Sequence, residues 1–269
     1  MSGRPVVAVV AHARKKLGGG LPELRKILAQ DADIIFAWGG DGMVQRCADA
    51  LAGQKAALAI VPAGTANLLA SNLGIPADLA AAVQTGLHGA RRWLDTGSVN
   101  GEHFAVMAGA GFDARMISGA DRKMKARLGR AAYLYSGARS LAGGRAKAVI
   151  DVDGQRFFRG RVSSVLVGNV GTILGGLDVF SGAQPDDGHL ELGVVTARNP
   201  ADWARVGARI VAGQPGRSPF VQVTSGKKIR VRFDRPFPYE LDGGARGTAS
   251  KLRVKVHPAS LRVCVPASD

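Results

Sequence analysis

Three short apolar segments, each ended by a turn and each followed by a helical pattern, most constrain the fold of this chain. The segments cover residues 6–11, 33–38 and 56–61. Continuous apolar runs of this length are typical of strands that are buried on both faces of a parallel sheet. Apolar residues recur at helical spacing in residues 21–30, 43–51 and 66–73. The alternation predicts a doubly wound α/β domain.

The pattern changes after about Arg92. Strand-like pieces follow one another at short spacing, at residues 104–108, 148–152, 162–168, 190–195, 229–233 and 251–256. Turns rich in Gly, Asp and Pro separate them, and helical patterns interrupt the series at 131–141 and 201–211. This pattern predicts a mostly antiparallel β domain. We therefore expect two domains, residues 1–94 and 95–269.

Charge and composition narrow the function classes. No apolar run approaches the roughly 20 residues that span a bilayer, and no signal peptide is recognisable, so we expect a cytoplasmic protein. The chain holds 36 basic and 21 acidic residues, a net charge of +15 that favours a polyanionic partner. No nucleic-acid-binding motif accompanies the charge, so we predict an acidic membrane face and no nucleic acid. Cys47 and Cys264 lie in apolar contexts and are predicted to be buried, reduced thiols.

Two turns carry the chemistry of the first domain. The sequence WGGDG at 38–42 follows a predicted strand, and its glycines allow the backbone to approach a phosphate. Asp41 in this turn would repel a bare phosphate, so it is expected to act through a metal ion or a hydroxyl. The next strand ends in PAGTAN at 62–67, where Thr65 and Asn67 are helix caps or ligand contacts. In a parallel sheet both turns fall at the carboxyl edge, where ligands bind.

With these two turns the sequence resembles the diacylglycerol kinase catalytic-domain family, which includes soluble bacterial diacylglycerol kinases, sphingosine kinases and ceramide kinases. Further blocks continue the resemblance to the end of the chain: DTGSVN at 95–100, GAGFD at 109–113, GN at 168–169 through GG at 175–176, PDDGHL at 185–190 and LDG at 241–243. The resemblance implies an N-terminal nucleotide domain and a C-terminal β domain with ATP between them.

The resemblance also implies a role for particular residues. A lipid hydroxyl would attack the γ-phosphate of ATP, and catalysis would depend on positioning and charge neutralisation. The expected catalytic residues are Asp41, Asp95 and Asp242, with Asp95 linking the acidic turn to the active site. The expected nucleotide contacts are Gly39, Gly40, Gly42, Gly64, Thr65 and Asn67. The expected magnesium ligands are Asp41 at the catalytic site and Gln184, Asp187 and His189 at a structural site. An ordinary Asp-Gly turn is the alternative for Asp187.

The sequence departs from the family pattern in two places. The family ends its last motif Asp-Gly-Glu and takes the Glu as general base or metal partner, whereas this chain has Gly244 there. Asp242, Asp41 or Glu240 would have to replace it, or the activity is weak or lost. At the start, one strand–helix unit is missing, so the nucleotide domain is predicted to be shortened. Basic residues at 14–16 follow the first strand as phosphate contacts or as a solvated loop.

Several expectations concern partners. Residues 115–130 interleave basic and apolar side chains and are expected to lie on an anionic membrane or to form an ordinary surface helix. We thus expect a cytoplasmic protein, peripheral at the inner face of the membrane, with a lipid substrate. The shortened sheet leaves an edge strand that favours a homodimer. Two other functions compete: a catalytically silent nucleotide- or lipid-binding protein, and an NAD kinase or phosphofructokinase relative with the same glycine turn.

Overall fold

The computed structural model describes residues 5–11, 32–111, 144–173, 177–180 and 182–267. The helices predicted at 21–30 and 131–141 lie outside these residues. So do the basic segments at 14–16 and 115–130.

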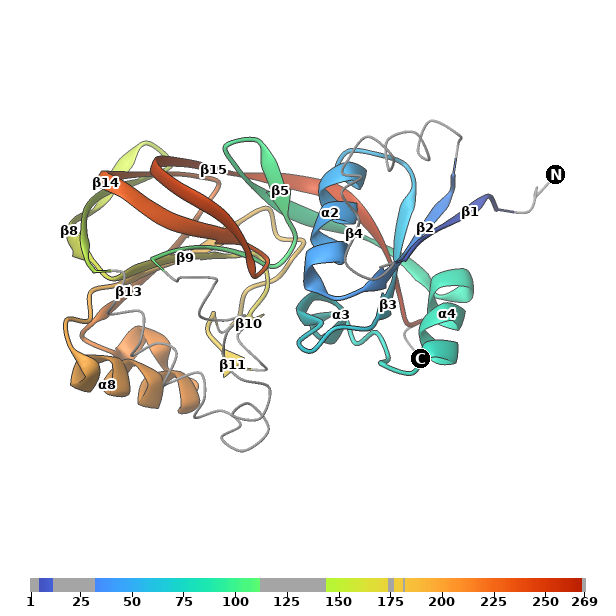
Figure 1. Cartoon of the computed structure of the whole chain (residues 1–269), viewed down its shortest axis with the longest axis horizontal. Coiled ribbons are helices and arrows are strands. Elements are labelled where there is room, and N and C mark those ends of the chain that lie inside the picture. The colour runs from blue at the N-terminus through green and yellow to red at the C-terminus, as the bar shows by residue number, and fades with distance from the viewer. Residues whose placement is uncertain (1–4, 12–31, 112–143, 174–176, 181, 268–269) are drawn as a thin grey trace.

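The first part of the chain is a parallel α/β layer (Figure 1). Strands β1 (Val7–Ala11), β2 (Ile34–Gly39) and β3 (Ala57–Pro62) are parallel and adjacent in this order. Helix α2 (Asp41–Leu51) follows β2, and α3 (Leu68–Asn72) follows β3. Helix α4 (Leu79–His88), which the sequence pattern did not predict, begins at the N-cap Asp78 and packs against β3. The α/β fold class is confirmed.

Strand β1 corrects one expectation. Residues 6–11 were predicted to be buried on both faces, but Val7 is 40% and Val9 62% exposed. Among the described residues β1 pairs with β2 alone, so it is the edge strand of the sheet. An apolar run therefore indicated a strand here but not its position in the sheet.

Two long strands connect the α/β layer to the rest of the molecule. Strand β4 (Ala90–Val99) pairs antiparallel with β15 (Gly244–Val265) along most of its length. The last part of β15 pairs in parallel with β3 through Arg262 and Val263. The C-terminal residues thus complete the sheet of the first part. The division into residues 1–94 and 95–269 stays a prediction, and its boundary falls within β4.

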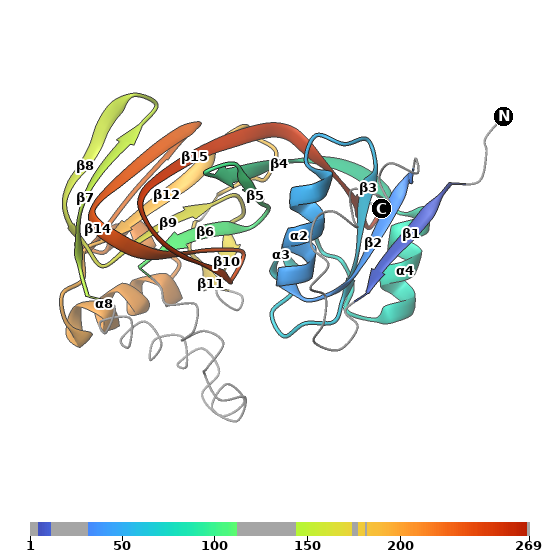
Figure 2. The ribbon, with the colours of Figure 1, turned by 45° about the horizontal axis from the view of Figure 1, so that its top comes forward.

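The second part is a sandwich of antiparallel strands with one long helix (Figure 2). One layer continues from β15 to β14 (Lys228–Leu241), β7 (Ala146–Val152) and β8 (Gln155–Val162). The other contains β6 (Met107–Ala110), β9 (Ser164–Gly168), β12 (Leu190–Val195) and β13 (Val221–Gly226). The remaining elements are β5 (Glu102–Phe104), the hairpin of β10 (Thr172–Ile173) and β11 (Leu177–Asp178), α8 (Pro200–Val211) and a short 3-10 turn (Pro215–Arg217). The predicted mostly antiparallel β domain is confirmed.

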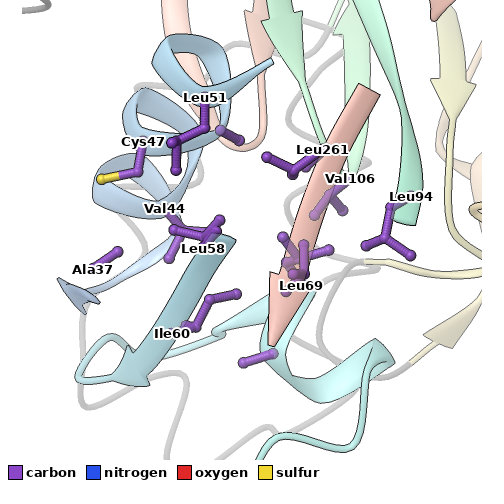
Figure 3. Close-up of a cluster of buried hydrophobic side chains, with 14 of the residues drawn as sticks. Ala37, Val44, Cys47, Leu51, Leu58, Ile60, Leu69, Leu94, Val106 and Leu261 are labelled. Atoms are coloured by element: carbon purple, nitrogen blue, oxygen red, sulfur yellow. The ribbon is translucent and has the colours of Figure 1, made fainter. Parts of the chain in front are cut away.

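One hydrophobic core joins the α/β layer to the returning strand (Figure 3). Val44 of α2, Leu58 of β3 and Leu261 of β15 belong to it and are buried. Cys47 lies in the same core and Cys264 is also buried, so both are free thiols as expected. Among the described helices, none combines the length and apolar composition that crossing a bilayer requires.

Candidate functional site

The two glycine turns predicted from the sequence lie against each other. Gly39 pairs with Pro62 at the carboxyl ends of β2 and β3, so both turns leave the same edge of the sheet. A β-carbon at Gly40 would stand 3.0 Å from Cα of Gly64, and one at Gly64 would stand 2.6 Å from Cα of Gly40. Only glycine at both positions permits this approach, so the two turns form one loop surface.

Asp41 joins the two turns. Its Oδ2 accepts the backbone N–H of Asn67 at 3.1 Å, and its Oδ1 accepts that of Leu68 at 2.5 Å. The carboxylate of the first turn therefore binds the first N–H groups of the helix that follows the second. Because each carboxylate oxygen has two lone pairs, both oxygens retain capacity for a cation.

The other predicted nucleotide contacts divide into two groups. Asn67 has a left-handed backbone (φ 47°). Its side-chain Oδ1 accepts the N–H of Gly64 at 2.8 Å, and its Nδ2 donates to the carbonyl of Gly64 at 2.9 Å. Its side chain thus holds the turn in shape. Thr65, in the second turn, and Gly42, in the first turn of α2, are exposed. Their role as nucleotide contacts stays a prediction.

Asp242 lies in the hairpin between β14 and β15 and is buried. Its carboxylate accepts backbone N–H groups from Ala105, Val106 and Met107 at 2.8–2.9 Å. Burial raises the pKa of Asp242 to about 6, while these three N–H groups lower it and the charge of Asp41 raises it. Through these three hydrogen bonds Asp242 positions the hairpin against the 105–107 segment.

Glu240 lies two residues earlier and has a different environment. It is 1% exposed, sits beside Gly109 of β6, and its Oε2 has no hydrogen-bond partner among the described residues. Burial, and secondarily the charge of Asp242, raise the pKa of Glu240 to about 7. A buried carboxyl group without a partner is a candidate proton acceptor near neutral pH.

A guanidinium group lies beside Gly244, where the family motif has its glutamate. Arg246 donates from Nη1 to the carbonyl of Gly244 at 2.9 Å and from Nη2 to Oε1 of Gln45 at 2.8 Å. It also pairs with Glu102 at 2.7 Å. Gln45 in turn donates to the carbonyl of His103 at 2.8 Å. The cluster connects the β14–β15 hairpin to α2. Its members are far apart in the sequence, so no local sequence pattern predicts it.

Asp95 is a buried carboxylate that joins two backbone segments. It accepts the N–H of Gly188 at 2.6 Å and the N–H of Ala259 at 2.7 Å, and its own N–H donates to the carbonyl of Pro185 at 2.6 Å. Ala259 has a positive φ and lies at the irregularity in β15 between His257 and Leu261. Asp95 thus ties the acidic turn to the strand that passes between the two parts of the molecule.

The acidic turn offers oxygen donors for a magnesium ion. Asp187 is partly exposed, and its Oδ1 accepts the N–H of His189 at 2.9 Å, while its Oδ2 has no partner within the described part of the chain. Gln184 is exposed and unpaired within the same residues. A carboxylate, an amide oxygen and the carbonyl of His189 suit Mg²⁺ by donor type. No group of three or more His, Cys, Asp and Glu side chains that would hold a metal occurs among the described residues.

Comparison with known proteins decides the family. The family described as "Diacylglycerol kinase catalytic domain" matches residues 6–99, and "YegS C-terminal NAD kinase beta sandwich-like domain" matches residues 106–265. This chain belongs to the diacylglycerol kinase catalytic-domain family, a family of lipid kinases. The resemblance inferred from the two turns is confirmed.

Individual relatives of the diacylglycerol kinase family agree with this assignment. The chain is 29% identical to "Diacylglycerol kinase" of Bacillus subtilis (strain 168), covering 86% of this chain and 78% of that protein. It is 32% identical to "Probable lipid kinase YegS-like" of Pseudomonas aeruginosa (strain UCBPP-PA14), covering 91% and 81%. A crystal structure of a diacylglycerol kinase from Bacillus anthracis str. Sterne has a TM-score of 0.73 at 22% identity, covering 97% of both chains. Yeast NADH kinase shares the fold alone, with a TM-score of 0.55 at 11% identity.

Proposed function

We propose that this protein is an ATP- and magnesium-dependent lipid kinase that transfers the γ-phosphate to the hydroxyl of diacylglycerol or a related lipid. The observation that carries the proposal is the contact between the turns at Gly40 and Gly64, with Asp41 joining them. Glycine turns before two helices present backbone N–H groups to phosphate oxygens. The nucleotide would lie on these turns, and bound magnesium would neutralise phosphate charge during transfer.

Each of the other site residues has a separate role in this proposal. Asp41 would hold the catalytic magnesium, and the oxygen donors of Gln184, Asp187 and His189 would hold a structural one. Asp95 and Asp242 bind backbone N–H groups and position the acidic turn and the hairpin. Of the carboxylates considered as bases, Glu240 is the one with an oxygen free of hydrogen bonds among the described residues. We therefore propose that Glu240 acts as the general base and accepts the proton of the lipid hydroxyl.

The test is transfer of labelled phosphate from ATP to diacylglycerol, ceramide and sphingosine in mixed micelles with magnesium. Wild type should label one of these lipids, and Asp41→Asn should not. Magnesium binding is measured separately as a rise in unfolding temperature with added MgCl2, which Asp187→Asn should reduce. No labelled lipid with any acceptor, although ATP binds, would contradict the kinase function.

A second candidate function has one observation in its favour. The carboxylate of the family motif is absent at Gly244, and the guanidinium group of Arg246 lies against this position. A nucleotide- or lipid-binding protein without transferase activity would tolerate this change. Tight ATP binding together with no phosphate transfer would select it over the kinase. The NAD kinase alternative has support from the fold alone. It predicts that labelled phosphate passes from ATP to NAD when NAD replaces the lipid in this assay.

A further inference from the structure

The exposed side of the β15–β14–β7–β8 layer carries a dense array of cations. Register places the side chains of β14 directly opposite those of β15 and β7, and those of β7 opposite β8. Ten exposed basic residues share this side, called here the basic face: Lys147, Arg156, Arg159, Arg161, Lys228, Arg230, Arg232, Lys251, Arg253 and Lys255. Figure 2 shows the four strands side by side at one end of the molecule.

The arrangement opposes fold stability. Three successive cross-strand pairs between β14 and β15 join like charges: Lys228 with Lys255, Arg230 with Arg253, and Arg232 with Lys251. Like charges directly opposite each other in an antiparallel pair destabilise it. Nothing in the packing requires them, because the alternate residues Ile229, Val231, Leu252 and Val254 form the core side of the same strands.

Acidic side chains do little to offset this charge. On the exposed side of these four strands, Asp151 pairs with Arg156 and Arg232. The carboxylate of Asp153, in the turn between β7 and β8, accepts the backbone N–H groups of Lys227 and Lys228. The carboxylate of Asp234, within β14, accepts the backbone N–H of Lys147. The remaining cations of the basic face have no ion pair within the described residues. The basic face therefore has positive charge that can bind an anionic partner.

The form of the face favours a broad anionic surface over a nucleic acid. It is the outer side of a sheet, and its cations are spread over four strands. Among the aromatic side chains of its strands, Phe158, Phe233 and Phe237 are buried, and Phe157 and Tyr239 are partly buried and pack against the same core. No fully exposed aromatic side chain on these strands therefore offers a platform for base stacking. Attraction to anionic lipid headgroups needs clustered Lys and Arg and no base contacts. At its far end the same β14–β15 hairpin carries Asp242 and Gly244 of the candidate site.

We propose that the basic face docks this protein on bilayers rich in anionic phospholipid, a role that rests on the proposed function because the substrate would be a membrane lipid. Each cation near an anionic membrane contributes roughly a factor of five to the binding constant. The contact is electrostatic, so it weakens as salt shortens the screening length.

The experiment measures sedimentation of the full chain with vesicles of phosphatidylglycerol and phosphatidylcholine, and with phosphatidylcholine alone. The test variant is Arg230→Gln with Arg253→Gln, which removes one cross-strand pair. The matched control is Arg205→Gln with Arg209→Gln, an exposed pair one turn apart on α8. The test variant should bind anionic vesicles roughly thirty-fold more weakly, while the control should bind as wild type does.

Two further measurements separate the outcomes. The unfolding temperature of the test variant should stay close to that of wild type, because the repulsion between Arg230 and Arg253 is lost together with the attraction of Arg230 to Asp151 on β7. An unchanged unfolding temperature excludes unfolding as the cause of weaker binding. Phosphate transfer to lipid in neutral detergent micelles should be retained in both variants. Unchanged vesicle binding by the test variant, or binding to duplex DNA in place of vesicles, would overturn the docking surface. No transfer by wild type in micelles would instead contradict the proposed function and leave the vesicle result standing.

Discussion

Nη1 of Arg246 lies 2.7 Å from the point where a β-carbon at Gly244 would stand. The backbone of Gly244 is not in the left-handed region, so an L-residue fits there once the flexible arginine moves and the carbonyl oxygen of Leu241, 3.3 Å from the same point, shifts slightly. Arg246 also binds Gln45 and Glu102. The guanidinium group thus takes the place from which the family's glutamate side chain would extend, and it holds the hairpin against α2.

This relationship predicts the effect of restoring the carboxylate. Gly244→Glu should fold within about 1 kcal/mol of wild type, because the blocking atom is the end of a flexible side chain. If the chain is a weakened kinase, the new carboxylate should raise phosphate transfer roughly a hundred-fold, the lower range for a general base. The gain should be larger with Arg246→Gln added, since the guanidinium would otherwise pair with the new carboxylate. Lipid phosphorylation assays on both variants check this, and no gain despite intact ATP binding would speak against it.

Asp41→Asn should abolish most activity at small cost in stability. Asparagine retains one acceptor oxygen for the N–H groups of Asn67 and Leu68, so unfolding should become easier by only about 1 kcal/mol. Loss of the negative charge should lower transfer at least a hundred-fold, since a cation would lose its ligand. The matched control is Asp78→Asn, another helix cap, which accepts from Ala81 at 2.9 Å. Equal activity loss in both variants would show that Asp41 acts through the fold alone.

Glu240 should make stability depend on pH. Its pKa is about 7 in the folded protein and 4.5 in the unfolded chain, mainly because of burial. Between pH 4.5 and pH 7 the folded state therefore holds a proton that the unfolded chain has released, and stability falls as pH rises. Glu240→Gln should remove this loss of stability. Its free energy of unfolding should exceed that of wild type by on the order of 3 kcal/mol at pH 8 and by little at pH 4. Urea denaturation at both pH values tests this, and an equal difference at the two would refute it.

Asp95 should couple two distant segments. Replacing it with alanine leaves the partly buried N–H groups of Gly188 and Ala259 without their acceptor, which should cost about 1–3 kcal/mol. Asp95→Asn should cost less. Hydrogen exchange should accelerate at residues 185–188 and 257–260 together. The control Asp153→Asn removes a carboxylate that binds Lys227 and Lys228 in a surface turn, and it should leave both segments unchanged. Faster exchange in one segment alone would contradict the coupling.

Local sequence determined the elements of the site. The turns around Gly40 and Gly64 could be predicted because an apolar run ends in glycines and a helical pattern resumes, and both features are set by neighbouring residues. Helix α8 and most strands could be recognised for the same reason. Helix α4 was missed although Asp78 is its N-cap, and β4 was missed because charged residues and Gly97 interrupt its pattern.

Tertiary structure decided which residues act on one another. Whether Asp242 was a free carboxylate depended on the N–H groups of residues 105–107, and the burial of Glu240 depended on its pairing with β6. The cation at position 246 reaches Gln45, 201 residues away in sequence. Sequence patterns report periodicity within a few turns of chain, whereas desolvation and hydrogen bonding depend on segments brought together only in the folded sheet. The sequence by itself therefore determined the glycine turns, the acidic residues and the excess of positive charge. The register of the sheet placed the like charges in rows and brought a guanidinium group against Gly244, where the family has a glutamate.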